Sequence, residues 1–251
     1  MSAPKPCQRI LVLAAAALLA ACGSVPRGET AAQADAPALY ARALADSAVA
    51  TPDKARPLAR IPDQPQVQVV SWVVGGRMPC QAPGCSFHVG ERRMWVTLAG
   101  EVQDICRRWG LQGDALRERM EQLLGLPPNT PPQWRKTHML TLQVPRDALE
   151  RPCLGEAVDE RGAPRCTPRS AKTTQPELLR FVLNQMADVW VDGDPQGPGY
   201  PFTRLGYTYD WHPKAAQSGN YGASEFVLKA GTAVLLEAEA TTDRFCESNR
   251  P

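Results

Sequence analysis

The chain has 251 residues, of which 28 are Lys or Arg and 26 are Asp or Glu. Two of the basic residues, Lys5 and Arg9, lie within the first 21 residues, which contain no acid, so the remainder carries 26 positive and 26 negative charges and is formally neutral. Nucleic-acid-binding domains normally carry an excess of positive charge. The charge balance therefore argues against nucleic acid as a partner.

An apolar run over residues 10–21 follows these two basic residues and leads into Cys22, Gly23 and Ser24. This order of charge, apolar core and small residues is typical of a secretory signal. A membrane-spanning helix is the alternative, but it needs about 20 apolar residues and the run has roughly 12. The segment therefore predicts export, with residues 1–21 removed as a signal peptide.

Residues 19–22, Leu-Ala-Ala-Cys, match a lipobox, so the segment resembles the signal of bacterial lipoproteins. The resemblance implies a diacylglyceryl group on the Cys22 sulfur and lipidation of the new N-terminus by an acyl chain such as palmitate. Several acyl chains together hold a protein stably on a membrane. An ordinary secretory signal with an incidental Cys is the other interpretation, and it also predicts export.

The residue after Cys22 is Gly23 rather than Asp. In Gram-negative lipoproteins, which this signal resembles, an Asp at that place favours retention in the inner membrane. We therefore expect the protein in the cell envelope, anchored by lipid in the periplasmic leaflet of the outer membrane.

Six cysteines remain outside the signal and the anchor: Cys80, Cys85, Cys106, Cys153, Cys166 and Cys246. An even number in an exported domain predicts disulfides. Fifteen pairings are possible for six cysteines. Short loops containing Pro or Gly favour Cys80 with Cys85 and Cys153 with Cys166, which leaves Cys106 for Cys246. No CxxC pair is present, so a metal site is not expected.

The composition divides the chain into three parts. Residues 1–21 are the signal peptide, and residues 22–66 are rich in Ala and Pro with little bulky apolar content, which predicts a lipidated N-terminus and a flexible tether. Within this tether, residues 36–50 have the pattern of a short helix. Residues 67–251 are expected to form a single globular domain.

Hydrophobic periodicity gives the elements of that domain. We expect strands over residues 67–74, 91–98, 138–144, 202–211, 225–229 and 232–240, helices over 99–109, 113–124 and 175–190, and a surface loop over 145–174. Ala230 and Gly231 form a turn between the last two strands. Such a mixture predicts an α+β fold, with a small, mainly antiparallel sheet and about three packed helices, stabilised by disulfides.

The densest polar and aromatic stretch covers residues 192–225. Its candidate ligand-binding residues are Asp192, Asp194, Arg204, Tyr207, Tyr209, Asp210, Trp211, His212 and Glu225. Rings beside carboxylates are typical of a sugar site. A strand over 205–211, however, would place the rings on one face and Asp210 and His212 on the other. The favoured interpretation is that the rings belong to the core, and a ligand cleft is the alternative.

Residues 192–197, Asp-Gly-Asp-Pro-Gln-Gly, match the first half of a calcium loop. Position twelve of such a loop should be a bidentate Glu, and here it is Thr203. The segment is therefore interpreted as a plain turn, and the sequence predicts neither a metal nor a cofactor.

No GxSxG, HExxH or SxxK motif occurs, and His88, His138 and His212 are far apart in the chain. The favoured hypothesis is a non-catalytic domain that binds an envelope protein or glycan. One alternative is a glycan or peptidoglycan hydrolase that uses two carboxylates among Asp192, Asp194, Asp210 and Glu225. Another is a structural assembly factor of the envelope.

Overall fold

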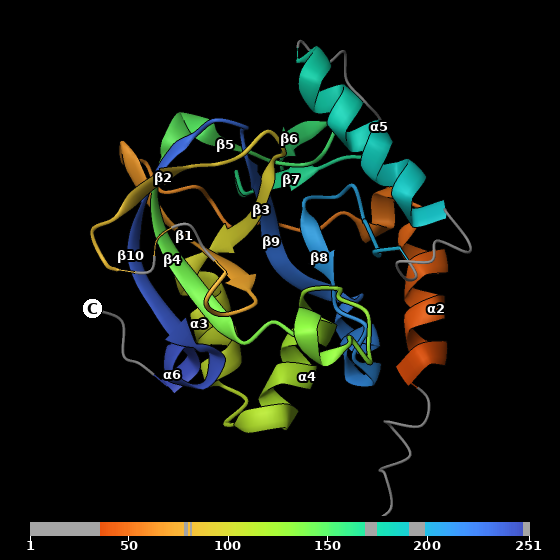
Figure 1. Ribbon diagram of the computed structural model, residues 1–251. Helices are drawn as coiled ribbons and strands as arrows, with labels where there is room; N and C mark the ends of the chain where they lie inside the picture. Colours follow the sequence, from red (N-terminus) through yellow and green to blue (C-terminus); the bar gives the residue numbers. More distant parts are fainter. Residues whose placement is uncertain (1–35, 78–79, 81, 169–174, 191–198, 248–251) are drawn as a thin grey trace, which may run out of the picture. The chain divides into compact units, whose positions relative to one another are not determined.

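The computed structural model describes residues 36–77, 80, 82–168, 175–190 and 199–247. Helices are α2 (Ala36–Ser47), α3 (Ala99–Arg107), α4 (Gly113–Leu123), α5 (Pro176–Trp190) and α6 (Thr242–Glu247). Strands are β1 (Gln66–Val73), β2 (Ser86–His88), β3 (Met94–Leu98), β4 (His138–Pro145), β5 (Leu149–Glu150), β6 (Glu156–Val158), β7 (Pro164–Cys166), β8 (Tyr207–Tyr209), β9 (Tyr221–Leu228) and β10 (Ala233–Thr241). The fold is α+β, as expected (Figure 1).

The main sheet has the strand order β2-β10-β4-β1-β3-β9-β5, and β8 pairs with β9 beside β5. The pairings among the described strands are antiparallel. β6 and β7 form a separate two-stranded ribbon. Three of these short strands, β5 to β7, lie within the stretch 145–174 that was expected to be loop.

The connection from β9 to β10 requires the sheet to curl. Four successive antiparallel pairings lead from β9 through β3, β1 and β4 to β10. Because each pairing reverses the strand direction, β9 and β10 run in the same direction. Parallel strands normally need a crossover of a dozen or more residues, yet only residues 229–232 join these two. Their ends meet because the sheet wraps around its own core. Val89 is hydrogen-bonded to the connection between β9 and β10: its N–H donates to the Thr232 carbonyl over 2.8 Å, and its carbonyl accepts from the Gly231 N–H over 2.9 Å.

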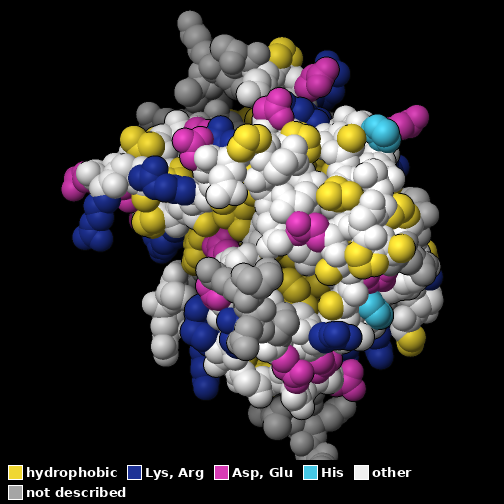
Figure 2. Space-filling model, turned by 90° about the vertical axis from the view of Figure 1, so that its left-hand side faces the viewer, with side chains coloured by type: hydrophobic (Ala, Val, Ile, Leu, Met, Phe, Trp, Pro, Cys, Tyr) yellow, Lys and Arg dark blue, Asp and Glu magenta, His cyan; other side chains and the backbone are white. Residues whose placement is uncertain are grey.

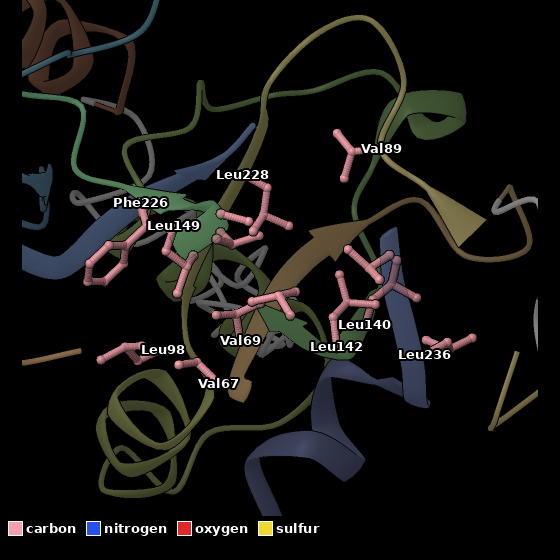
Figure 3. Packing of buried hydrophobic residues seen from close by; sticks show 14 residues of the cluster. Val67, Val69, Val89, Leu98, Leu140, Leu142, Leu149, Phe226, Leu228 and Leu236 are labelled. Atoms are coloured by element: carbon pink, nitrogen blue, oxygen red, sulfur yellow. The ribbon is translucent and has the colours of Figure 1, made fainter. Parts of the chain in front are cut away.

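The concave side of the curled sheet holds the main core (Figure 3). β1 supplies Val67 and Val69 to this side, while Val70 and Trp72 point to the opposite side, where α3, α4 and α6 pack. Both faces of β1 are thus buried. Because side chains alternate along a strand, this one strand joins the two apolar clusters.

The three disulfides pair as the sequence analysis expected. Cys80 is bonded to Cys85, Cys153 to Cys166, and Cys106 to Cys246. The last bond links α3 to α6 across 140 residues of sequence. Of the described helices, none is both long enough and apolar enough to cross a bilayer.

The segment 36–66 corrects our expectation of a long tether, because it packs onto the domain. Tyr40 of α2 is only 2% exposed, and its ring meets that of Trp211 edge-on at a centroid distance of 5.8 Å. Leu58 is buried with Leu205 in another cluster. Tyr40 and Leu58 thus each pack against a residue more than 100 positions away. Residues 36–66 therefore belong to the folded part.

The strand expected over residues 202–211 is also shorter than predicted. Arg204 and Gly206 have positive φ angles of 58° and 75°, so the backbone turns there. Such angles are incompatible with a regular strand. Only β8, over Tyr207–Tyr209, remains paired with β9, together with an isolated bridge between Phe202 and Thr208.

Candidate functional site

The three rings expected on one face of residues 205–211 are buried, which confirms the core interpretation. Tyr207, Tyr209 and Trp211 are each less than a tenth exposed. The Tyr207 hydroxyl donates to the Lys54 carbonyl over 2.9 Å, and the Trp211 Nε1–H donates to the Leu126 carbonyl over 3.0 Å. Because their faces and polar atoms are both occupied, these rings offer no platform for a sugar.

Tyr209 and Tyr207 line one small cavity beside α2. The Tyr209 hydroxyl donates to the Asp46 carboxylate over 3.0 Å, and burial raises the pKa of the Tyr209 phenol well above its ordinary value. The cavity measures about 10 Å³ and is lined also by Thr203 and Leu205. This volume suits a single water molecule rather than a substrate.

Asp210 is held in a buried ion pair. The Arg119 guanidinium of α4 donates to both of its carboxylate oxygens, over 3.0 Å and 2.5 Å, and the Asp210 side chain is 4% exposed. The His212 N–H also donates to this carboxylate over 3.0 Å. A carboxylate engaged in this way positions the chain and is not free to act as an acid or a base.

His212 and Arg204 likewise have structural partners. His212 Nδ1 accepts from the Lys214 N–H over 3.2 Å, and burial, together with the Arg119 charge, lowers the pKa of the imidazole. The Arg204 guanidinium donates to the Ala48 carbonyl over 2.9 Å, which fastens the end of α2 to the residue 202–206 turn. Both residues therefore hold segments together.

Glu225 is the most unusual of the candidate residues. It lies on β9 opposite Thr97 of β3, and it is buried on the sheet face away from the main core. Within the described part of the chain, its Oε1 atom has no hydrogen-bond partner. Burial raises the pKa of this carboxyl to about 8, so the neutral acid predominates at pH 7. A buried, protonated carboxyl does not supply the ionised partner that a hydrolase pair needs.

Sequence analysis missed a second buried polar group, which joins α3 to β9. Glu101 Oε1 accepts from the Ser224 N–H over 3.0 Å, from the Ser224 hydroxyl over 3.2 Å and from the Tyr221 hydroxyl over 3.3 Å. Burial raises the pKa of Glu101, and these hydrogen bonds oppose the shift. Arg151 lies in the same charge network, and its guanidinium covers the Phe226 ring at 4.5 Å. No sequence motif marks this group, because its members come from separate elements.

This Glu101 network is structural rather than catalytic. Ser224 resembles a nucleophile beside a carboxylate, but it is completely buried, and its hydroxyl accepts from the Ala59 N–H over 2.7 Å. A nucleophile must reach its substrate. The network therefore ties the 52–61 segment and α3 to β9.

The remaining candidates lie outside the described residues. These are Cys22, at which lipidation is expected, and Asp192 and Asp194, together with the rest of the partial calcium loop up to residue 197. Thr203, which stands at position twelve of that loop, is buried and donates its hydroxyl to the Tyr207 carbonyl over 2.7 Å. Within the described ranges, no three His, Cys, Asp or Glu side chains lie close enough to hold a metal ion.

Helix α5 has an apolar surface that the domain covers only in part. Leu178 and Val182 are buried against Phe202, whereas Leu183 is 49% exposed. Leu179 and Met186, which are half-buried, lie at helical spacing from Leu183 on the same side. We call these three residues, Leu179, Leu183 and Met186, the α5 stripe. It is the best candidate for a contact surface in this part of the domain.

Comparisons of the chain with protein-family models, with curated proteins and with solved structures found no match.

Proposed function

We propose that the chain is a lipid-anchored lipoprotein of the cell envelope and that its domain works by binding an envelope protein through the α5 stripe. The signal-like N-terminus and the three disulfides support export. The observation that carries the binding role is the incomplete burial of α5. An amphipathic helix normally turns its whole apolar arc to the core, and here Leu183 remains half exposed.

The chemistry of the stripe favours a protein over a glycan. It consists of aliphatic and thioether side chains, which gain free energy from apolar contact and do not bind sugar hydroxyls. A glycan site would need exposed rings next to carboxylates, and the rings of residues 207–211 are in the core. A partner with an apolar groove or helix face would fit the stripe.

Lipid labelling tests the anchor. We expect cells expressing the chain to incorporate radioactive or alkyne-tagged palmitate into it, and the Cys22→Ala variant to incorporate none. Flotation of envelopes on a density gradient should place the wild type in the outer-membrane fraction and release the variant. Labelling that persists in Cys22→Ala would contradict the anchor.

Site-specific crosslinking tests the α5 stripe. A photoreactive phenylalanine analogue is placed at Leu183 in living cells, with Val158 of β6, which is 68% exposed, as a control position outside the stripe. We expect one discrete adduct from position 183, none from position 158, and loss of the adduct when Met186→Asp is added. The captured protein is then purified, and it should bind the wild type but not Met186→Asp. An adduct that still forms in the Met186→Asp variant would contradict the assignment of the α5 stripe as the binding surface.

The alternative that the protein is a hydrolase can be tested directly. Asp210 is engaged with Arg119, and Glu225 is buried and protonated, so the described geometry does not favour it. Turnover of peptidoglycan or glycans by the purified protein, abolished by Asp192→Asn or Asp194→Asn with the fold retained, would overturn the binding proposal.

A further inference from the structure

The Cys80–Cys85 bond differs from the other two disulfides in its exposure. Both of its cysteines are partly exposed, and so are their surroundings, since residues 82–84 and 86 are exposed. The four cysteines of the other two bonds are each less than a twentieth exposed. A thiolate must reach a sulfur atom before it exchanges with a disulfide. Cys80–Cys85 is therefore the bond that a reductant in solution meets on the folded protein.

This bond also depends least on the fold. Cys80 and Cys85 are 5 residues apart in the chain, whereas the other two pairs are separated by 13 and 140 residues. In the chain-entropy model, the bond that closes the shortest loop stabilises the fold least. The coupling is reciprocal, so the fold in turn protects this bond least against reduction. Its loss leaves the rest of the domain folded.

The bond closes a loop at one end of the main sheet. Among the described strands, β2 is the last one on the β10 side (Figure 1). The Gly84 N–H donates to the Leu236 carbonyl over 2.8 Å, and the Leu236 N–H donates to the Cys85 carbonyl over 2.8 Å. These two hydrogen bonds extend the pairing of β2 with β10 beyond Ser86. We call Cys80, Gly84 and Cys85 the edge clip.

The other end of β2 is held independently of the disulfide. Phe87 packs against the main core, and Val89 is buried in it. Val89 is also bonded through its N–H and its carbonyl to residues 232 and 231. Opening of the disulfide therefore loosens residues 84–86 and leaves the second half of β2 in place.

We infer that the Cys80–Cys85 bond is a redox-sensitive switch, which a protein dithiol with a Cys-x-x-Cys pair opens to release the start of β2 from β10. This inference does not rest on the α5 stripe. Strand edges are the parts of a sheet that pair with other chains. A bond that controls an edge therefore changes what the sheet presents to its surroundings without unfolding the domain.

The exchange proceeds in two steps. Cys80 packs partly against the main core, so the reductant thiolate attacks the Cys85 Sγ. The bond between the two Sγ atoms breaks, a mixed disulfide forms on Cys85, and Cys80 leaves as a thiolate that takes up a proton. The second thiol of the reductant then loses its proton, attacks the mixed disulfide and releases Cys85, which is protonated in turn. Two electrons pass to the edge clip, and the reductant keeps the new disulfide.

Timed reduction tests which bond opens. The oxidised full-length protein in detergent micelles is treated with dithiothreitol without denaturant, quenched with acid, alkylated with N-ethylmaleimide and mapped by mass spectrometry. We expect Cys80 and Cys85 to be alkylated at least about 100 times faster than the other four cysteines, because a buried disulfide reacts only when the domain opens. Reduction of another pair first, or of all three pairs together, overturns the inference.

Amide hydrogen exchange tests whether the edge responds. After reduction, the amides of Gly84 and Leu236 should exchange at least about ten times faster, while those of Val89 and Gly231 keep their rates. The matched control is the double variant Cys80→Ser with Cys85→Ser, which should show the faster exchange without reductant and no further change with it. Unchanged exchange at Gly84 and Leu236 in the reduced protein overturns the switch, even if the bond is reducible.

Mixed-disulfide trapping tests the reductant. A Cys-x-x-Cys protein whose second cysteine is replaced by Ser cannot complete the reaction, so it should remain attached to Cys85. Attachment to Cys80 overturns the order of attack. If no adduct forms while dithiothreitol still opens the bond, a protein dithiol as the reductant is overturned.

Discussion

Arg119 and Asp210 are 91 residues apart in the chain and form a two-point ion pair, with both carboxylate oxygens bound by one guanidinium. The Arg119 guanidinium also lies over the Trp109 ring at 4.5 Å, so one side chain joins α4, the loop after α3 and the segment after β8. This arrangement explains why an acid in the polar and aromatic stretch has a structural role.

Asp210→Asn should destabilise the protein by about 2 kcal/mol, because a buried guanidinium loses its charged acceptor. Urea unfolding followed by far-UV circular dichroism measures the change. Asp114→Asn is the control, since Asp114 pairs with Arg117 but its side chain is 92% exposed, and it should cost less than about 0.5 kcal/mol. Equal effects of the two substitutions would refute the structural role of Asp210.

Glu225→Gln should change how stability depends on pH. Burial raises the pKa of Glu225 to about 8, above its unfolded value near 4.5, so its contribution to stability is complete below pH 4.5 and is lost as pH rises through 8. The Gln variant has no proton to lose. We expect its free energy of unfolding to exceed that of the wild type by roughly 4 to 5 kcal/mol at pH 8.5 and nearly to match it at pH 4.5. Parallel pH profiles of the two proteins would contradict the buried neutral acid.

The Cys106–Cys246 disulfide should contribute the most stability of the three. In the chain-entropy model, a bond that closes a 140-residue loop contributes about 5 kcal/mol and one that closes a 5-residue loop about 2 kcal/mol. The double Ala variant at positions 106 and 246 should therefore unfold at a lower urea concentration than the double variant at 80 and 85. Peptide mapping without reductant checks the pairing. The reverse order of stability would contradict this assignment.

Gly222→Ala should prevent normal folding. A Cβ atom at position 222 would collide with the Thr208 side chain and with the backbone carbonyls of Leu123 and Thr208. β8, β9 and α4 meet there, and backbone atoms cannot move aside individually. Gly90→Ala is the matched control, because no heavy atom lies within 4 Å of its added Cβ, and it should alter stability by less than about 0.5 kcal/mol. Soluble yield and thermal melting compare the two, and a G222A variant as stable as G90A would refute the close packing.

Truncation tests where the domain begins. A chain that starts at Ala36 should fold, and one that starts at Val67 should not, because it lacks Tyr40 and Leu58. Within the full chain, Tyr40→Ala should cost about 3–5 kcal/mol as a deletion of a buried ring. Proteolysis resistance and two-dimensional amide spectra measure folding. If the chain that starts at Val67 is well folded, the interpretation of residues 22–66 as a long tether would hold after all.

Several features followed from local sequence patterns. Alternation of apolar residues identified β1, β4 and β10, and helical periodicity identified α3, α4 and α5 within a few residues of their ends. The disulfide pairs also followed, because two of the bridges close short loops and the third was then fixed by elimination. Such inferences succeed because each depends on neighbours along the chain or on a simple count.

Other features depended on contacts between distant segments. Sequence could not show that Tyr40 fills a site at Trp211, that Asp210 pairs with Arg119 or that the Glu225 side chain is buried, because each outcome depends on which surfaces the curled sheet brings together. Residues 230 and 231 form the expected turn between β9 and β10, but β3, β1 and β4 lie between these two strands in the sheet, which the sequence pattern did not show.

The sequence by itself thus determined the composition of the elements, the cysteine pairing and the signal that predicts an anchor at Cys22. The tertiary structure decided that residues 36–66 pack onto the domain and which candidate side chains are engaged in structural contacts. The physical reason is that periodicity and turn chemistry act over a few residues, whereas burial and ion pairing are decided by residues 90 to 170 positions apart that only the folded chain brings into contact.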